Sequence, residues 1–221
     1  WVLAECVPGG TSTAEALLRG LGVDAAGVVS GSLRQPPHSL RGALVQQGLE
    51  AMTARGISAE APLEVLAALG DPFQAMALGV LQGLFLPAKG EGPQALLAGG
   101  SQMLALAGLW MASLSQTERA ACRGQLAVAT TSWVMQEPGS NLELLANRLA
   151  AVWGVRPPLF SSALRFDRCQ QQALLDYECG YVKEGVGAGG LAWLTQLAGL
   201  DPQALAAACD QACGQLLKVE P

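Results

Sequence analysis

The sequence is poor in charge and has no basic cluster. Charged residues make up only 14% of its 221 residues, and its 13 Lys and Arg are outnumbered by 18 Asp and Glu. A protein that binds nucleic acid needs a basic stripe against which the phosphates can lie. Because no cluster of Lys and Arg occurs in this chain, its composition argues against a nucleic-acid partner.

Residues that bind metals are also scarce. His38 is the sole histidine, and the six cysteines, at positions 6, 122, 169, 179, 209 and 213, contain no CxxC pair. Cys209 and Cys213 stand four residues apart on an expected helix, where core packing is a commoner role than metal ligation. We therefore expect free thiols in a reducing cytoplasm, and neither a metal nor another cofactor.

One segment is apolar enough to raise the question of a membrane. The 21 residues from 95 to 115 carry no charge, and a segment of that length can span a bilayer. It contains Gly99-Gly100-Ser101-Gln102 near its start, however, and it has no Lys or Arg anchor at either end. A buried strand, a glycine turn and a buried helix explain the segment better, so the membrane interpretation is the less favoured alternative and no membrane contact is expected.

What the chain has in abundance is apolar sequence, divided into short and long segments. Hydrophobic residues make up 51% of the chain, and its mean hydropathy is +0.31. Strands are expected at residues 1–4, 26–30, 94–98, 125–131 and 158–162, and helices at 11–21, 40–55, 62–70, 72–87, 101–114, 141–153, 169–177, 185–197 and 201–217. Strands that alternate with helices predict a Rossmann-like α/β fold, in which helices cover both faces of a mostly parallel sheet in three layers.

We expect this fold to form one domain over residues 1–221. The chain begins inside an expected strand, with no cap or turn before Trp1. An upstream segment is therefore also expected, and without it the domain is incomplete at its N-terminus.

Glycine-rich turns precede three of the expected helices, at residues 8–11, 97–101 and 184–190. Backbone N–H groups at the start of a helix favour an anion. Hydroxyls from Thr11, Ser12 and Thr13 add donors, and Thr11 or Thr13 is expected to cap the first helix. Glycines also allow tight turns and a close approach of helix to sheet. Because we expect all three turns at one end of the sheet, the sequence favours a ligand site there.

Two carboxylates adjoin these turns. Glu5 and Glu184 each directly precede a glycine-rich helix start, at opposite ends of the chain. A carboxylate in a partly dry pocket has a raised pKa and can serve as a general base. The alternative is structural: Glu5 would accept a backbone hydrogen bond, and Glu184 would be a solvated surface charge. Composition alone does not separate these interpretations.

Four segments resemble motifs of one enzyme family, in the family's order. Residues 4–14 resemble the Gly-Glu-x-x-x-Gly-x-Thr-Thr signature of nicotinate-nucleotide–dimethylbenzimidazole phosphoribosyltransferases, most closely that of their archaeal and cyanobacterial relatives. Residues 70–79 are similar to the family's Gly-x-x-x-x-Ala-Met-x-x-Gly helix, and residues 97–102 stand where the family has Leu-Asp-Gly-x-x-Ser/Thr. Residues 181–189 resemble its Gly-Glu-Gly-x-Gly-Ala motif. Ala98 and Lys183 depart from these patterns.

The resemblance implies a transferase of cobalamin synthesis. Such an enzyme moves the phosphoribosyl group of nicotinate mononucleotide to dimethylbenzimidazole or a related base, including a purine, and releases nicotinate. Glu184 would be the general base, and Glu5 would orient ribose hydroxyls or the departing base across the same pocket. The substrate and its phosphate would be bound by Gly9, Gly10, Thr11, Ser12, Thr13, Ser30, Ser32, Arg41, Gly99, Gly100, Gly185 and Gly187, with Arg41 as the phosphate cation.

The resemblance also implies a homodimer. An alternative function is that of a relative that keeps the nucleotide pocket without catalysis and serves a regulatory or salvage role. A cavity in front of Glu184 would favour catalysis, whereas loss of the base pocket would favour binding alone.

Overall fold

A single parallel sheet organises the molecule. The computed structural model describes residues 1–7, 9–31, 33–35, 37–85, 94–181 and 187–217. Its four strands lie in the order β1-β2-β3-β4, and every neighbouring pair is parallel. The strands are β1 (Val2–Ala4), β2 (Ala95–Ala98), β3 (Leu126–Thr130) and β4 (Leu159–Ser161). The expected parallel α/β sheet is thereby confirmed.

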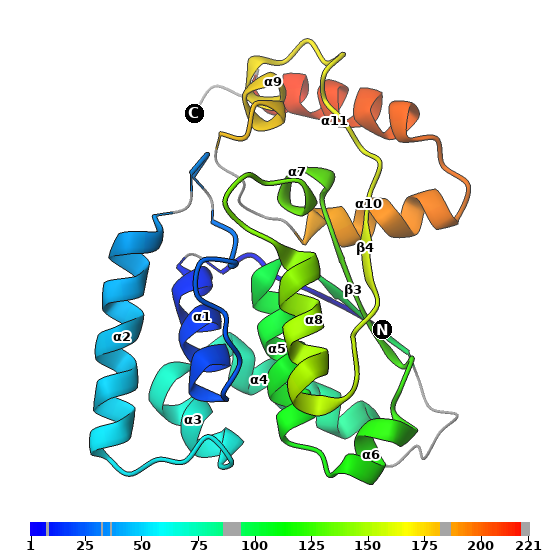
Figure 1. Ribbon diagram of the computed structural model, residues 1–221. Helices are drawn as coiled ribbons and strands as arrows, with labels where there is room; N and C mark the ends of the chain where they lie inside the picture. Colours follow the sequence, from blue (N-terminus) through cyan, green and yellow to red (C-terminus); the bar gives the residue numbers. More distant parts are fainter. Residues whose placement is uncertain (8, 32, 36, 86–93, 182–186, 218–221) are drawn as a thin grey trace.

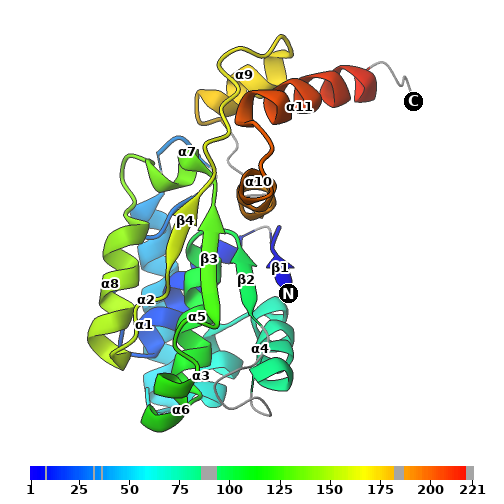
Figure 2. The same ribbon diagram turned by 90° about the vertical axis from the view of Figure 1, so that its right-hand side faces the viewer.

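Helices cover both faces of this sheet. On one face α1, α5 and α8 pack side by side, and on the other α10 lies across β2, β3 and β4 (Figure 2). The helices are α1 (Gly10–Gly20), α2 (His38–Ala54), α3 (Pro62–Leu69), α4 (Pro72–Phe85), α5 (Ser101–Ala112), α6 (Gln116–Ala121), α7 (Ser132–Met135), α8 (Leu142–Trp153), α9 (Gln172–Glu178), α10 (Ala188–Leu197) and α11 (Pro202–Leu216). The expected three-layer arrangement is therefore confirmed.

The outer helices group around these layers. Figure 1 shows α2 and α3 beside α1, and α9 with α11 beyond the end of the sheet at which α7 begins. A cluster of Trp133, Leu164, Phe166 and Ala192 joins α7 and α10 to this C-terminal part. Cys209 of α11 packs against that cluster, which supports core packing as its role.

The central helix α5 explains the long apolar segment. Every residue of α5 from Ser101 to Met111 is buried, and β2 directly before it is buried along its whole length. Residues 95–115 thus form a buried strand, a glycine turn and a buried helix, as the sequence predicts. Within the described ranges, no helix combines the length and the apolar character that a membrane span requires.

Three local predictions were wrong or incomplete. Residues 26–30 form turns rather than a strand: Gly27 has a left-handed φ of 71°, which breaks an extended chain, although the following valines are buried. Neither Thr11 nor Thr13 caps the first helix. This helix begins at Gly10, one residue before the expected start, and its N-cap is Gly9. The short helices α6 and α7 were not expected, although α6 begins with a Ser115–Glu118 capping box.

Candidate functional site

The three glycine turns supply three helix N-termini without side-chain caps. The N-cap residues of α1, α5 and α10 are Gly9, Gly100 and Gly187, and no hydrogen bond from a described side chain caps any of these helices. At α6, α7, α8 and α11 the N-cap side chains of Ser115, Thr131, Asn141 and Asp201 accept a backbone N–H bond. No described side chain caps α2, α3 or α9 either. Uncapped N–H groups at a helix start are suited to an anionic ligand.

These helix starts gather at the carboxyl end of the sheet. The N–H of Glu5, directly after β1, donates to the carbonyl of Ala98 at the end of β2, at 3.2 Å. An added Cβ at Gly187 would lie 2.8 Å from the Glu5 carbonyl oxygen and 3.0 Å from that of Ala98. The described parts of the three turns therefore meet, as expected from parallel strands whose ends share one edge.

Glu5 is buried at this edge against a glycine. Its relative exposure is 8%, and its Oε2 accepts a hydrogen bond from the N–H of Val7 at 3.3 Å. A Cβ at Gly99 would stand 2.6 Å from the Glu5 Cγ and 2.8 Å from its Oε1. Gly99 is thus needed to make room for the Glu5 carboxylate. This carboxylate accepts a backbone bond, as the structural interpretation expected, and it also lies beside Gly99, directly before the uncapped start of α5.

At the start of α10 the glycines serve close packing. A Cβ at Gly190 would lie 2.5 Å from the Cβ of Ala98, and a Cβ at Gly189 would collide with the backbone of Thr130 and Thr131. The helix therefore lies directly on the strand ends, an approach that any side chain at these positions would prevent. For this turn the structural explanation of the glycines is confirmed, and a contact of Gly187 with substrate stays a prediction.

The first turn of α1 is tied to α4 and α5 by Asp71. The hydroxyl of Thr13 donates to Asp71 Oδ2 at 2.6 Å, and Nε2 of Gln102 donates to the same oxygen at 3.2 Å. Asp71 Oδ1 accepts the N–H of Gln74 at 2.9 Å, which caps α4. Thr13 is therefore a scaffold contact in this structure, and its role in phosphate binding stays a prediction. Thr11 and Ser12, on the same turn, are half-buried.

Ser30 closes over the start of α5. Its N–H donates to the hydroxyl of Ser101 at 2.9 Å, and the two hydroxyl oxygens are 3.1 Å apart. Ser101 is the first residue of α5 after the N-cap Gly100. Sequence reasoning placed Ser30 near the glycine turn but did not identify Ser101 as its partner.

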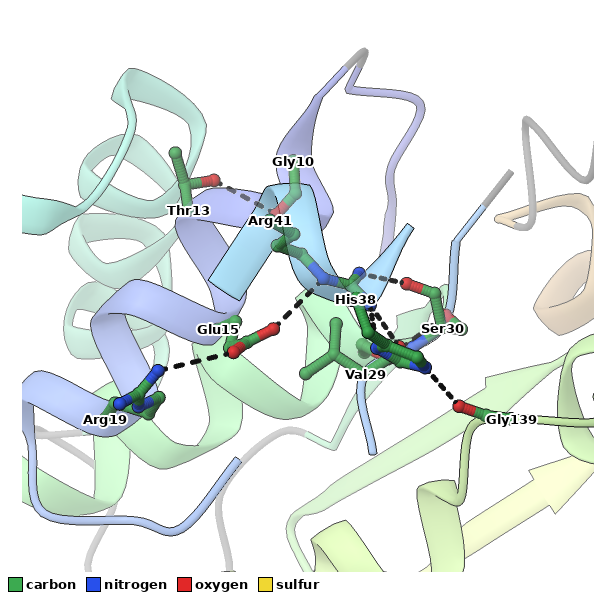
Figure 3. Close-up of polar contacts among 10 residues, drawn as sticks. Gly10, Thr13, Glu15, Arg19, Val29, Ser30, His38, Arg41 and Gly139 are labelled. Atoms are coloured by element: carbon green, nitrogen blue, oxygen red, sulfur yellow. Dashed lines mark hydrogen bonds and ion pairs between the residues drawn. The ribbon is translucent and has the colours of Figure 1, made fainter. Parts of the chain in front are cut away.

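Arg41 lies inside the protein, at the centre of a polar cluster (Figure 3). Its exposure is 3%, its Nε is 3.0 Å from Glu15 Oε2, and its terminal nitrogens donate to the carbonyls of Ser30 and Val29 at 2.7 and 2.9 Å. Burial lowers the pKa of Arg41, while the charges of Glu15 and Glu137 act in the opposite direction. The guanidinium therefore holds the loop after α1, and the predicted phosphate contact of Arg41 gains no support from this geometry.

The same cluster fixes the tautomer of His38. Nη2 of Arg41 lies 2.9 Å from His38 Nδ1, and His38 Nε2 lies 2.6 Å from the carbonyl oxygen of Gly139. Because an arginine can only donate, Nδ1 accepts, and Nε2 carries the proton donated to Gly139. His38 thus joins the start of α2 to the loop that follows α7.

A cavity of about 830 Å³ opens beside the carboxyl end of β3. Its walls come from the loop 33–35, from α7 with the loop after it, and from residues 178–181. Arg34, Trp133 and Tyr181 are among its lining residues, and sequence reasoning singled out none of them.

Three of the predicted site residues lie outside the described ranges. Ser32, Glu184 and Gly185 are not described, so their roles stay predictions. Tyr181, three residues before Glu184, lines the cavity beside β3. Among the residues that the structure does describe, no group of three or more His, Cys, Asp or Glu could hold a metal ion.

The fold and these turns define an α/β protein with clustered helix N-termini at the carboxyl edge of a parallel sheet. The chain is 47% identical over 223 residues to a UPF0284 protein of Prochlorococcus marinus and 46% identical over 221 residues to one of Parasynechococcus marenigrum. Each alignment covers 98% of this chain and 54% of the relative. A UPF0284 protein of Gloeobacter violaceus is 44% identical over 208 residues, which are 94% of this chain and 52% of that protein.

The chain therefore spans about half the length of the curated relatives it matches. No protein-family model matches it. The names of these relatives state no activity and no ligand.

Proposed function

We propose that the chain binds nicotinate mononucleotide and transfers its phosphoribosyl group to a nitrogen of dimethylbenzimidazole or a related base, with release of nicotinate. The observation that carries this proposal is the placement of the buried Glu5 carboxylate beside Gly99, directly before the uncapped start of α5. Helix N–H groups suit a phosphate, and a carboxylate suits ribose hydroxyls, which donate hydrogen bonds to it.

The reaction is a single displacement at the anomeric carbon of the ribose. The acceptor nitrogen forms the new bond to this carbon while the bond to the nicotinate ring nitrogen breaks. The electron pair of the broken bond stays with the nicotinate nitrogen and neutralises its positive charge. One inversion converts a β-nucleotide into an α-nucleotide, so the reaction needs no covalent enzyme intermediate and none of the cysteines as a nucleophile.

The acceptor must also lose the proton from its ring N–H. The family resemblance assigns this proton to the carboxylate of Glu184. Glu5 is assigned the hydroxyls of the ribose, because its side chain lies after β1 and next to the start of α5, one of the helix starts that would hold the phosphate. In this proposal Glu5 orients the ribose and Glu184 accepts the proton.

The test is release of nicotinate, measured by chromatography after incubation with nicotinate mononucleotide and dimethylbenzimidazole, adenine or no base. We expect release that requires the added base. Glu184→Gln should lower the rate by about 10²–10⁴-fold, the usual contribution of a general base. Glu60→Gln is the matched control, because Glu60 is exposed on the connection between α2 and α3 and should leave the rate unchanged.

Two other outcomes would overturn the proposal. Tight binding of nicotinate mononucleotide without release by the chain would support the non-catalytic nucleotide-binding relative instead. Release that survives Glu184→Gln would remove Glu184 from the mechanism. The whole Prochlorococcus marinus relative, assayed in parallel, shows whether any missing activity requires the part of the relatives that the chain does not span.

A further inference from the structure

The cavity beside β3, here called the Arg34 cavity, is defined by Arg34, Trp133, Glu137, Arg165, Glu178 and Tyr181. Its volume of about 830 Å³ lies within the usual range of small-ligand pockets. One wall is formed by α7, which directly follows β3 at the carboxyl edge of the sheet. The cavity therefore lies where α/β proteins bind their ligands. None of the described residues assigned to the phosphoribosyl site lines this cavity.

The Trp133 wall of this cavity is rigid. The Trp133 ring stacks on Phe166 with ring centroids 5.0 Å apart, and Tyr177 meets it edge-on at the same distance. Its Nε1 donates to Glu178 Oε2 at 3.0 Å, and Glu178 also accepts the N–H of Phe166 at 2.7 Å. These contacts fix the orientation of the Trp133 ring and preorganise this wall of the cavity.

The charged side chains on the cavity walls differ in whether another residue compensates their charge. Arg165 forms an ion pair with Glu178 and lies over the Trp133 ring, so its charge is compensated. Glu137 accepts a hydrogen bond from the Ser140 hydroxyl at 2.8 Å. Arg34 forms no ion pair with any carboxylate in the described part of the chain; its contacts there are with Tyr181. Arg34 is thus the guanidinium of this cavity whose charge the described carboxylates leave uncompensated.

The contact of Arg34 with Tyr181 holds this guanidinium at the cavity. Its Nη1 donates to the Tyr181 hydroxyl at 3.3 Å, and its Cζ lies 5.0 Å from the ring centroid. An arginine has five N–H donors, so the contact with the Tyr181 hydroxyl leaves enough donors for a bidentate bond to a carboxylate. The two residues are 147 positions apart in the sequence, so this arrangement depends on the complete fold.

We infer that the Arg34 cavity binds the aromatic base of the donor nucleotide, and that Arg34 recognises its carboxylate. This inference rests on the proposed function and deepens it, because it makes Arg34 the residue that distinguishes a pyridine carboxylate from the corresponding amide. Flat rings line the cavity, whereas the uncapped helix starts lie at the Glu5 edge. The carboxylate is therefore assigned to Arg34 and the phosphate to the helix starts.

The experiment compares three donors that differ by one group each. Nicotinate mononucleotide has both anions, nicotinamide mononucleotide lacks the carboxylate, and nicotinate riboside lacks the phosphate. The kcat/KM for base-dependent release is measured with each donor for the unmodified protein, Arg34→Met, Arg34→Lys and the control Arg55→Met. Arg55 is exposed at the end of α2 and does not line the cavity.

We expect Arg34→Met to lower kcat/KM for nicotinate mononucleotide by about tenfold or more, the scale of a lost charge-assisted bidentate contact. The value for nicotinamide mononucleotide should stay within about twofold, so the preference for the acid disappears. Arg34→Lys should keep part of the preference, because an ammonium keeps the charge but not the bidentate geometry. Arg55→Met should change neither value.

Equal losses for the two mononucleotides, with nicotinate riboside unaffected, would assign Arg34 to the phosphate and overturn the inference. Unchanged constants in Arg34→Met would overturn it as well. Failure of the proposed function is distinct, since the unmodified protein would then release neither nicotinate nor nicotinamide from these donors. In that case calorimetric titration with nicotinate and nicotinamide decides: an Arg34-dependent preference for nicotinate supports the cavity assignment, and equal affinities contradict it.

Discussion

Glu15 and Arg41 form an ion pair in the protein interior, with Arg41 Nε 3.0 Å from Glu15 Oε2 and each side chain no more than 3% exposed. Glu15 belongs to α1, the helix that follows the first glycine-rich turn, and Arg41 belongs to α2, so the pair joins these two helices. The same guanidinium donates to two backbone carbonyls before the loop 33–35. The pair thereby positions the loop from which Arg34 reaches the cavity.

We predict that Arg41→Met acts mainly on stability. Glu15 would keep only the half-exposed Arg19, 3.6 Å away, as an ion-pair partner, and removing one partner of a buried pair costs up to about 3–5 kcal/mol of the free energy of unfolding. Denaturant unfolding measures this loss, and Arg55→Met is an exposed control that should change stability by less than about 0.5 kcal/mol. A stable Arg41→Met variant with a selectively raised KM for nicotinate mononucleotide would instead support the phosphate contact that the sequence predicts.

The pair itself can be tested by adding Glu15→Met to Arg41→Met. Because the double variant leaves no unpaired charge, we expect it to be less destabilised than the sum of the single variants, by about 1 kcal/mol or more. In the single variant Arg41→Met and in the double variant alike, the carbonyls of Val29 and Ser30 lose the N–H groups that Arg41 donates to them. We therefore do not expect the double variant to regain the full stability of the unmodified protein. Strict additivity would show that the two charges do not stabilise each other.

A second prediction concerns the contact of α10 with the sheet. Gly190→Ala would place a Cβ 2.5 Å from the Cβ and 2.8 Å from the Cα of Ala98, and strand backbone cannot yield as a flexible side chain does. We expect a loss of about 1–3 kcal/mol in the free energy of unfolding, as for other overpacked cores. The readout is denaturant unfolding.

Gly79→Ala is the matched control for this substitution. Gly79 also lies within a helix, α4, but an added Cβ there meets no atom within 4 Å. We expect it to be neutral or to stabilise by about 0.5–1 kcal/mol, because alanine favours the helix. Equal effects of the two substitutions would mean that helix propensity, and not the approach of α10 to Ala98, determines the result.

Much of the fold could be predicted from the sequence, because hydrophobic period and turn residues act locally. The buried run at residues 95–98, the glycine pair after it and the apolar helix that follows correspond to β2 and α5. The prediction failed at residues 26–30, where buried valines follow a left-handed Gly27. Burial there is imposed by tertiary packing, and a short apolar run alone does not specify an extended chain.

The candidate site was predictable only in part. The meeting of Glu5 with Gly99 follows from parallel topology, which brings the ends of β1 and β2 to one edge. The burial of Arg41 against Glu15 depends on how α2 packs against α1, and the sequence does not contain that information in any local pattern. The Arg34–Tyr181 contact likewise joins residues 147 positions apart. The sequence could predict which residues share the carboxyl edge of the sheet, but it could not predict which side chains on different helices and loops contact one another.

A third prediction concerns Asp71 as a tie between three helices. Its carboxylate accepts hydrogen bonds from the Thr13 hydroxyl, the Gln102 amide and the Gln74 N–H. Asp71→Ala should lose the helix cap, worth about 1 kcal/mol, and bonds to a charged group, worth about 1.5–3 kcal/mol each. Because these contributions are not additive, we expect a total loss of about 2–4 kcal/mol in denaturant unfolding.

Asp201→Ala removes a cap of the same kind without the two other side-chain partners, since Asp201 accepts the N–H of Ala204 at the start of α11. It should cost about 0.5–2 kcal/mol, the usual range for a cap. If Asp71→Ala were no more destabilising than Asp201→Ala, the contacts with Thr13 and Gln102 would contribute nothing measurable.

The cysteines give a fourth prediction, which reports on packing without any substitution. Burial raises the pKa of Cys122, Cys169 and Cys209, and at Cys169 nearby acidic groups such as Asp210 raise it further. A raised thiol pKa leaves less thiolate at a given pH, and the thiolate is the form that reacts. At pH 8 these three thiols should therefore react with iodoacetamide more slowly than the exposed Cys6 and Cys179.

Peptide mass spectrometry after timed alkylation measures each thiol separately. As the pH rises through the raised pKa values, the rates of Cys122, Cys169 and Cys209 should continue to climb and approach those of the exposed thiols, whereas below the pKa values of all these thiols the ratio of the rates should stay constant. Denatured protein is the control, because unfolding removes burial and should bring the rates together. If Cys169 and Cys209 reacted in the folded protein as fast as Cys6, the packing of α9 and α11 against the Trp133 cluster would not persist in solution.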